Sequence, residues 1–362
     1  MTASHRPGTS CPYPIRPGAA ALLVLLGLAA CGGGGGNGNN NGNGNIGGWT
    51  PGVFLDAGTF EAMCVSPRSG IDPATGNPYP DVAGTRSDEN NFLRSYSNDT
   101  YLWYDEIVDR NPALFNSSLA YFDQLRTTAT TPSGAHKDRF HFTYPSDEWF
   151  ALSQSGAAAG YGAQWVLLQI EPPRKALVAY TDPNTPAANA NLVRGTEVLA
   201  IDGVDLANGN DIDTLNNGLF PPGAGESHSF RVRDPGGSER DVTLVSEIIT
   251  SAPVQNVAAV STPTGNVGYL LFNDHIAPAE QALIDAVDEL AAQNIADLVV
   301  DIRYNGGGFL DIASEFAYMI AGANATGGRT FEVLRFNDKH PATDVLDSAF
   351  WTISATLNNL PP

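Results

Sequence analysis

The sequence is poor in cysteine and in basic residues. It has 3 cysteines in 362 residues, and 19 Lys and Arg against 39 Asp and Glu, which gives a formal net charge of −20. Nucleic-acid binding needs a basic face, so this balance excludes nucleic acid as a partner. We interpret the acidity as a solvated surface that keeps the protein soluble. The hydrophobic content of 42% is sufficient for folded cores.

The sequence also lacks a long apolar run. The longest candidate, Ala19 to Ala30, is shorter than the ~20 residues that span a bilayer. It follows the basic residues His5, Arg6 and Arg16 and ends in small residues, as an export signal does. We therefore predict a signal peptide at residues 1–31.

The end of this signal, Leu28-Ala29-Ala30-Cys31, resembles the lipobox of bacterial lipoproteins. The resemblance implies cleavage before Cys31, lipidation of Cys31, and an exported protein anchored in the cell envelope, on the outer membrane or the periplasmic face. An ordinary secretory signal with a chance cysteine is the alternative. Residues 32–48 are almost wholly Gly and Asn, which predicts a disordered tether.

Cysteine counting then leaves Cys64 alone, because Cys11 is removed with the signal and Cys31 carries lipid. We expect no internal disulfide and a tolerated or structural thiol at Cys64. His136 and His141 have no clustered carboxylates or cysteines at metal spacing, so no metal and no cofactor are predicted.

The most informative stretch begins with the apolar, β-branched run Leu298 to Ile302 and breaks at Gly306, Gly307 and Gly308. Helical spacing follows from Leu310 to Ile320. A strand, a glycine turn and a helix expose backbone N–H groups that attract an anion or a developing oxyanion. Gly307 and Gly308 are the candidates, and a tight turn with positive φ explains the same glycines.

Residues 265–272 predict another strand and residues 279–292 an amphipathic helix, which makes a βαβα unit with a parallel sheet. The segments VGYLLFNDH and DLVVDIRYNGGG resemble the core of the carboxy-terminal processing, or tail-specific, serine peptidases of family S41. The resemblance covers roughly residues 90–362. It implies that the glycine turn supplies an oxyanion-hole amide beside a serine nucleophile and a lysine base.

We assign neither the serine nor the lysine to this protein, because the sequence stops at Pro362, about where the family's serine strand begins. Ser314, Ser348 and Ser354 do not fit the expected position, and we regard the distance from Ser314 to Lys339 as a coincidence. Two explanations stay open. The sequence is part of a complete peptidase, or it is a short form that binds peptides without cutting them.

The sequence of residues 153–250 predicts short strands separated by turns. Within it, Thr185 to Gly203 resembles the pattern of small residues and glycines that is typical of PDZ domains. Such domains bind the C-terminus of another polypeptide by adding it as a strand to a sheet edge. The resemblance implies that Tyr161, Gly162 and Ala163 bind the terminal carboxylate. A PDZ fold that serves only as a spacer is the alternative.

Residues 87–152 predict a small helical N-terminal domain with helices at 89–96, 100–108 and 119–125, while residues 49–86 read as irregular. The predicted fold class is therefore α+β multidomain, with this helical domain, a PDZ-like β-rich domain and a partial α/β peptidase core at 251–362. The predicted function is a serine-type endopeptidase that captures C-termini of envelope proteins. The alternatives are an inactive peptide-binding lipoprotein and a structural surface lipoprotein.

Overall fold

The computed structural model describes residues 49–334, 336–340 and 346–349. The predicted signal peptide, the lipidation site Cys31, the tether and Ser354 lie outside these residues. The described residues form two compact units, one of residues 147–325 and one of residues 49–146 with 326–349. Each unit is described by itself.

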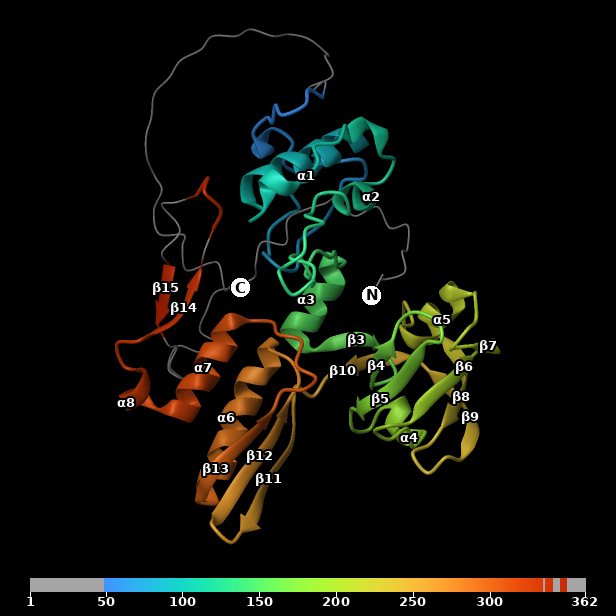
Figure 1. Ribbon diagram of the computed structural model, residues 1–362, viewed down its shortest axis with the longest axis vertical. Helices are drawn as coiled ribbons and strands as arrows, with labels where there is room; N and C mark the ends of the chain where they lie inside the picture. Colours follow the sequence, from blue (N-terminus) through green and yellow to red (C-terminus); the bar gives the residue numbers. More distant parts are fainter. Residues whose placement is uncertain (1–48, 335, 341–345, 350–362) are drawn as a thin grey trace. The chain divides into compact units, whose positions relative to one another are not determined.

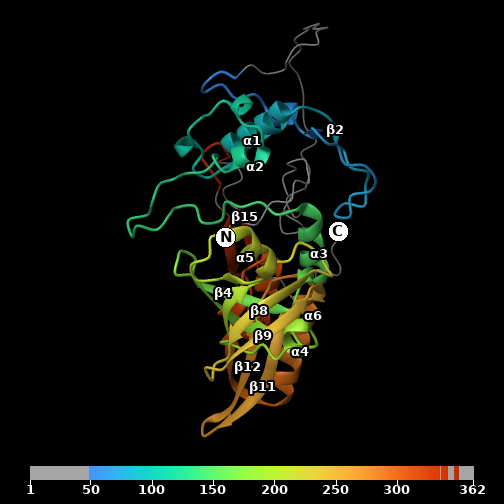
Figure 2. The ribbon, with the colours of Figure 1, turned by 90° about the vertical axis from the view of Figure 1, so that its right-hand side faces the viewer.

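The first unit contains a three-stranded sheet in the order β11 (Val254–Thr262), β12 (Gly265–Phe272) and β13 (Ile295–Asp301). β12 and β13 are parallel, with Gly268 paired to Leu298 and Leu271 to Asp301, which confirms the predicted parallel pair. Helix α6 (Ala277–Ala292) connects them, and α7 (Leu310–Ala321) follows β13 (Figures 1 and 2). The antiparallel strand β11 had no sequence prediction.

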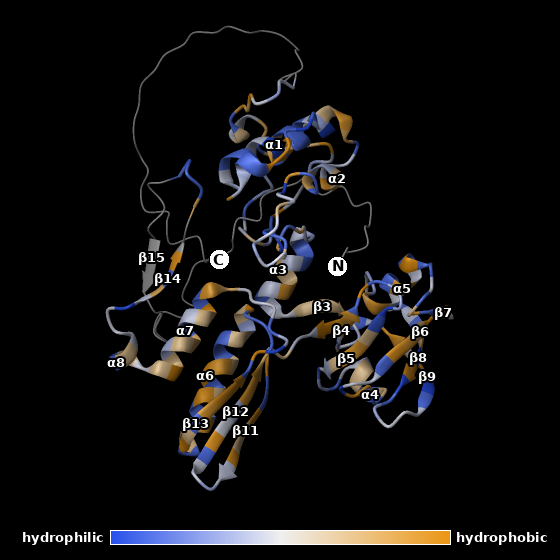
Figure 3. Cartoon of the chain, in the orientation of Figure 1, coloured by the Kyte–Doolittle hydropathy of each residue, from blue (hydrophilic) through white to orange (hydrophobic). Residues whose placement is uncertain are grey.

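The core of this sheet lies on the side covered by α6. Leu283 and Leu290 of α6 and Ile312 and Phe316 of α7 pack with Leu270 and Phe272 of β12. In Figure 3 the strands of this sheet are mainly orange, the colour of apolar residues. The prediction that residues 298–302 form a buried run is wrong for Val299 and Ile302. Val299 is 49% exposed and Ile302 is 59% exposed.

A second sheet in the same unit has the strand order β4-β5-β6-β8-β9, with β7 paired to β6. Its strands and helices are β4 (Ala163–Gln169), β5 (Lys175–Thr181), α4 (Pro186–Asn189), β6 (Glu197–Ile201), β7 (Val204–Asp205), α5 (Ile212–Leu219), β8 (Ser227–Arg233) and β9 (Glu239–Val245). Apolar residues alternate along these strands and gather around Trp165 and Phe230, whose rings stack at 5.9 Å. The short strands predicted for residues 153–250 are therefore present.

Helix α3 (Ser146–Ser155) leads into β3 (Ala157–Gly160), which pairs antiparallel with β10 (Glu247–Thr250). One strand of this ribbon precedes the PDZ-like sheet in the sequence and the other follows it. The two strands therefore bring the beginning and the end of that segment together. A short helix, α8 (Ala323–Thr326), ends the unit.

The second unit is organised around α1 (Arg86–Thr100). The other elements are 3-10 turns at Ala57–Thr59, Tyr104–Glu106 and Pro112–Leu114, the paired strands β1 (Met63–Cys64) and β2 (Val82–Ala83), and α2 (Ser118–Phe122). The predicted helix at residues 100–108 is wrong: Tyr101 is extended and ends α1, and only one 3-10 turn follows. The segment predicted as irregular contributes Phe60 and Met63 to the core.

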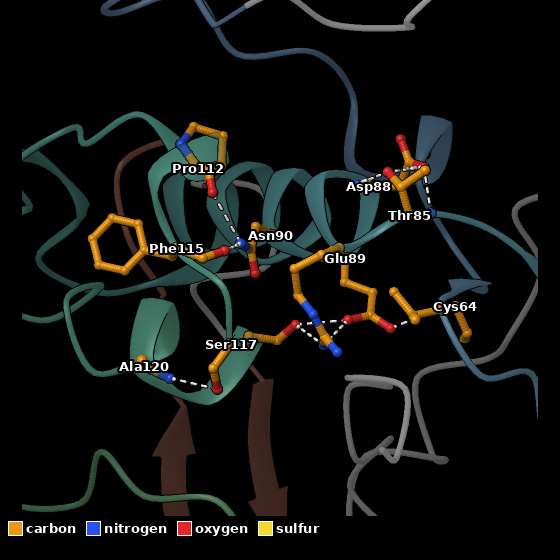
Figure 4. A network of polar contacts seen from close by, with 12 residues as sticks. Cys64, Thr85, Asp88, Glu89, Asn90, Pro112, Phe115, Ser117 and Ala120 are labelled. Atoms are coloured by element: carbon orange, nitrogen blue, oxygen red, sulfur yellow. Dashed lines mark hydrogen bonds and ion pairs between the residues drawn. The ribbon is translucent and has the colours of Figure 1, made fainter.

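α1 is a mainly polar helix that is nevertheless buried along one side, and side-chain hydrogen bonds make this possible. Figure 4 shows the contacts. Glu89 accepts hydrogen bonds from Val65 N at 2.8 Å and from Ser118 Oγ at 2.7 Å, and it pairs with Arg86. Asn90 Nδ2 donates to Pro112 O at 2.9 Å. These bonds tie the preceding and following loops to the helix.

Cys64 corrects the prediction made from cysteine counting. It is fully buried and disulfide-bonded, so the expectation of a lone thiol is wrong. The other cysteines, Cys11 and Cys31, lie outside the described residues.

The C-terminal segment completes the second unit. β14 (Thr330–Leu334) pairs with β15 (Leu346–Ala349), and the intervening Asn337 Nδ2 donates to Asp99 O at 2.7 Å and to Tyr101 O at 3.1 Å. Lys339 Nζ donates to Asn98 O at 2.6 Å. Residues 337–340 therefore supply donors to the carbonyl groups at the end of α1, which a helix cannot satisfy by itself.

Within the described ranges, no helix combines the length and apolarity needed to cross a bilayer. The same residues contain no cluster of three or more His, Cys, Asp or Glu suited to a metal ion.

Glu315 provides a test of the α6–α7 packing. It is 2% exposed, and burial first, then the neighbouring Glu280 and Asp311, raise its pKa to about 7. Because the folded pKa lies above the ordinary value, the stability of the fold should fall as pH rises from about 4.5 to about 7. Glu315→Gln should remove this slope and raise the free energy of unfolding at pH 8 by about 1 kcal/mol, after allowance for solvent screening.

Urea unfolding at pH 5 and pH 8 measures this difference, with Glu289→Gln at an exposed position of α6 as the control. Equal pH slopes for Glu315→Gln and the unmodified protein would contradict the expectation.

Candidate functional site

The glycine turn lies where two parallel strands end side by side. β12 runs into Asn273, Asp274 and His275, and β13 runs into residues 302–308. Because Leu271 pairs with Asp301, these two segments leave the sheet at the same edge. The carboxyl edge of a parallel sheet is where ligands of open α/β folds bind.

Backbone hydrogen bonds join the two segments. Gly306 N donates to Asn273 O at 3.3 Å, His275 N to Gly307 O at 2.9 Å, and Phe309 N to His275 O at 2.8 Å. His275 and Gly308 therefore form a parallel bridge beyond the regular ends of the strands. The bridge fixes the path of the glycines before α7 begins at Leu310.

The turn requires glycine for two separate reasons. Gly307 has φ +90° and Gly308 has φ +132°, a backbone region that side chains disfavour. In addition, a Cβ on Gly308 would lie 2.3 Å from His275 O, whereas a Cβ on Gly307 would meet nothing within 4 Å. Gly307 is therefore needed for its conformation, and Gly308 also for the close approach of His275.

The two predicted amides differ in their partners. Gly307 N donates to Asn305 Oδ1 at 2.8 Å, so its hydrogen is used inside the turn. The N–H of Gly308 has no acceptor among the described residues, and Gly308 is exposed. Of the two candidates, Gly308 is therefore the amide that remains available to an anionic oxygen.

Asn305 holds the turn from inside. Its Nδ2 donates to Phe272 O at 3.1 Å, and its Oδ1 lies 2.8 Å from Gly307 N and 2.9 Å from His275 Nδ1. One carboxamide thus contacts the end of β12, the imidazole and the glycine turn. Burial lowers the pKa of His275, which favours the neutral imidazole.

Asp301 and Arg303 form an ion pair where β13 ends. Arg303 donates to both carboxylate oxygens of Asp301, and Tyr269 OH donates to Asp301 Oδ2 at 2.8 Å. The hydrogen bond from Arg303 holds the pKa of Asp301 well below its usual range. An ionised carboxylate with these donors supports the turn and is a poor proton acceptor.

Two acidic residues of the first unit, Asp274 and Asp182, lie close enough for their charges to interact. Burial, and then the charge of Asp182, raise the pKa of Asp274 to about 6. Asp182 follows β5, and its Oδ1 accepts a hydrogen bond from Gln255 Nε2 of β11 at 2.9 Å. Asp182 thereby joins the PDZ-like segment to the three-stranded sheet.

Tyr304 of the glycine turn also contacts the PDZ-like segment. Its ring lies 5.7 Å from the ring of Tyr180 in β5, and the guanidinium carbon of Arg194 lies 5.3 Å from its centroid. The loop after β13 is therefore packed against residues that belong to the PDZ-like segment.

The predicted peptide-binding loop precedes β4, the edge strand of its sheet. Tyr161 is 2% exposed and its ring packs against Phe230. Its side chain therefore belongs to the core, and a role in peptide binding would have to use its backbone groups. Gly162 has φ +72°, and a Cβ there would lie 2.4 Å from Thr185. Ala163 begins β4. The roles of these residues stay predictions.

None of the described serines with a sequence prediction lies at the turn. Ser314 is 2% exposed within α7, and Ser348 lies in β15 of the second unit. Lys339 also belongs to the second unit, where it donates to Asn98. We therefore assign no nucleophile.

The sequence reasoning missed His275 and Asn305. Both lie in the motifs VGYLLFNDH and DLVVDIRYNGGG. A usable signal was present: a histidine in the segment that follows one parallel strand and an asparagine directly before the glycines that follow the next are brought to the same edge of the sheet.

Two segments of the chain match known protein families. Residues 266–337 match Peptidase family S41, and residues 88–144 match the Peptidase S41 N-terminal domain. The protein is 30% identical over 175 residues to a carboxyl-terminal-processing protease of Picosynechococcus sp., and the match spans 46% of this chain and 39% of that protein. It is 29% identical over 161 residues to the chloroplastic C-terminal processing peptidase of Tetradesmus obliquus, where the match spans 38% and 32%.

Among solved structures, the protein is similar to a putative S41 protease from Bacteroides fragilis, at 19% identity and a TM-score of 0.46, with 75% of this chain and 66% of that one matched. The chain spans about a third to two fifths of the length of the curated relatives it matches. The matched segments support a relationship to the S41 peptidases.

Gly308 and Gly307 provide a matched pair of variants. Gly307→Ala should cost about 1–2 kcal/mol of stability, because only its positive φ disfavours a side chain. Gly308→Ala should cost clearly more, because its Cβ also meets His275 O. Urea unfolding of both variants measures the difference, and equal losses would show that the close approach of His275 to Gly308 is not rigid.

Proposed function

We propose that this protein, two segments of which match the S41 peptidases, acts in peptide-bond hydrolysis of the carboxy-terminal processing type. The observation that carries the proposal is the N–H of Gly308, a residue that is exposed. It has no acceptor among the described residues and is held at φ +132° beside the carboxyl ends of β12 and β13. The glycine turn also lies within the segment that matches the peptidase family.

The chemistry needs such a donor. When a nucleophile attacks a peptide carbonyl, the oxygen becomes negatively charged, and a fixed N–H stabilises that charge without reorganising. Loss of one donor of this kind lowers turnover by about 10²- to 10³-fold in other enzymes. The serine nucleophile and lysine base of the family are assigned to no residue described here.

The PDZ-like segment would hold the substrate's C-terminus. Its β4 is an edge strand, and the loop of Tyr161, Gly162 and Ala163 lies at the beginning of that edge. An added strand would gain backbone hydrogen bonds from β4 and place its carboxylate at the loop amides. Tyr304 packs against Tyr180 and Arg194. This contact would hold the PDZ-like segment, and with it the captured peptide, near the glycine turn.

The cellular setting completes this proposal. The predicted signal peptide and lipidation of Cys31 would export the protein and anchor it to the cell envelope. Its substrates would then be envelope proteins with accessible C-termini.

A second candidate is a peptide-binding lipoprotein that performs no chemistry. The observation that favours it is the lack of a serine at the glycine turn among the described residues. Both candidates use the same PDZ-like segment, and they differ only in hydrolysis.

Peptide capture is tested on the full-length protein with fluorescent peptides. A peptide with an apolar C-terminal residue and a free carboxylate should bind at least tenfold more tightly than the same peptide ending in a carboxamide. Gly162→Ala should weaken binding, because its Cβ would displace the loop from Thr185. Gly237→Ala is the control, because this glycine also has positive φ but has open space around it in the β8–β9 turn. Equal binding of both peptides would remove the capture role.

Hydrolysis is tested with a folded reporter protein that carries an unstructured apolar tail. The full-length protein should shorten the tail, and Gly308→Ala should lower the rate by about 10²-fold or more, because its Cβ would meet His275 O and displace the Gly308 N–H. Circular dichroism would verify that the variant is folded. Retained peptide binding without any cleavage would favour the second candidate.

A further inference from the structure

We propose that residues 138–144, with Phe140 and Phe142 near their centre, form a membrane-contact segment that binds an anionic lipid surface. The inference is independent of the proposed hydrolysis, because it concerns the second unit and not the glycine turn. It gives this unit a direct contact with lipid, in addition to the predicted lipidation.

Phe140 and Phe142 are the most exposed aromatic side chains among the described residues, at 76% and 65%. By contrast, Phe60 and Phe92 are buried in the core of the same unit. Tyr144 is 37% exposed, so aromatic side chains reach solvent at three alternate positions. Single exposed apolar residues are ordinary, but a group of large apolar side chains on a surface marks an interaction site.

Asp138 and His141 hold the segment from the inside. Tyr101 OH donates to Asp138 Oδ2 at 2.6 Å, and the backbone N–H of Phe140 donates to Asp138 Oδ1 at 3.0 Å. The ring of His141 stacks on Phe122 with centroids 3.9 Å apart, and its Nε2 lies 2.8 Å from Phe122 O. Successive side chains of an extended chain point to opposite sides. The His141 side chain is 6% exposed, so the aromatic residues on either side of it are turned outward.

The aromatic residues are accompanied by cations that the protein does not neutralise. Residues 124–146 contain three basic residues and one acidic residue, in a chain with a net charge of −20. Arg126 and Arg139 are exposed, and neither has an ion-pair partner among the described residues. In the same unit, by contrast, Arg68 pairs with Asp81 at 2.9 Å. This part of the surface is therefore locally basic on an acidic protein.

Both arginines lie at the membrane-contact segment. Burial raises the pKa of Asp138, but the hydrogen bond from Tyr101 and the charge of Arg126 help to hold it below the ordinary value. Arg126 is therefore close to Asp138, where the segment begins. The guanidinium carbon of Arg139 lies 5.8 Å from the ring centroid of Phe140. Aromatic rings and unpaired cations thus occur together.

A lipid surface fits this combination better than a protein partner does. Aromatic side chains are stable at the membrane–water interface, and Lys and Arg bind anionic headgroups. A protruding ring enters a fluid interface directly, whereas a folded partner needs a complementary hollow for each ring. In a symmetric dimer built on this segment, the unpaired arginines of the two copies would face one another.

The net negative charge of the protein does not oppose this contact strongly. At physiological salt, charges more than about 8 Å from the lipid are largely screened, so the cations beside the rings outweigh distant acidic residues. The second unit also follows the predicted tether directly, at Trp49. A Gly-rich coil of the length of residues 32–48 has a mean reach of about 20–25 Å. Lipidation of Cys31 would therefore keep this unit close to the lipid surface.

The first test places a fluorescent reporter in the segment. The added tryptophan of Phe142→Trp is followed in the full chain with vesicles of equal parts phosphatidylglycerol and phosphatidylcholine, after subtraction of the emission of the unmodified protein. Lipids brominated in their acyl chains should quench it. Ile71→Trp is the matched control, because Ile71 is 60% exposed in the same unit but lies outside the segment, and its emission should not be quenched. Binding through the predicted signal peptide does not produce a signal that is specific to one position.

The second test removes the cations from Phe142→Trp. Arg126→Gln and Arg139→Gln should each raise the vesicle concentration at half-maximal quenching about fivefold, because each cation near an anionic surface strengthens binding. Arg110→Gln is the control, because Arg110 is also exposed and has no ion-pair partner among the described residues, and it should have no effect. With vesicles of phosphatidylcholine alone, none of the three substitutions should change the quenching.

The outcomes decide between the occupants of the surface. Equal quenching of Phe142→Trp and Ile71→Trp, or quenching of neither, would overturn the proposal. Dimers in the absence of lipid that Phe140→Ser abolishes, found by analytical ultracentrifugation together with unquenched Phe142→Trp, would replace the membrane by a second copy of the chain. Quenching that requires phosphatidylglycerol and both arginines would support the proposal, whether or not the protein hydrolyses peptides.

Discussion

The carboxamide of Asn305 is the interaction on which the candidate site depends. It joins the end of β12, the imidazole of His275 and the N–H of Gly307 by three contacts between 2.8 and 3.1 Å. Because Gly307 N is satisfied there, only Gly308 N remains available of the two predicted amides. A single polar side chain therefore decides which of the two amides has an acceptor within the turn. The glycines allow the positive φ angles of the turn, and the hydrogen bond from Gly307 N to Asn305 holds the turn in one conformation.

Much of the first unit was predictable from the sequence because its signals are local and regular. Alternating residues marked the strands of the PDZ-like sheet, and apolar runs bounded by glycine marked β12 and β13. β11 was missed, since its partly exposed residues give no strong period. Exposure of Val299 and Ile302 was also missed, because an apolar sequence does not tell how many layers cover a sheet. The contact between His275 and Asn305 depends on the register of β12 and β13, which the sequence alone does not show.

The second unit shows why polar helices escape such predictions. α1 buries Glu89, Asn90 and Arg94, and their partners come from loops at residues 50–65 and 109–118. An apolar stripe is the usual sign of a buried helix face, and here hydrogen bonds and ion pairs replace much of it. Breaking one member of such a network leaves its partner buried and unsatisfied, which costs more than the net value of the bond. The loops and the helix should therefore be stable only together.

The open side of β13 has a consequence for the protein in solution. Among the described residues β13 is the last strand of its sheet, and the exposed Val299 lies on it. An edge strand has unpaired backbone N–H and C=O groups with which another polypeptide can pair. Proteins usually protect such a strand with charged residues, proline or a covering segment. Unless further polypeptide covers this strand in the cell, concentrated solutions of the protein should self-associate through it, and dilution or a short competing peptide should keep the molecules apart.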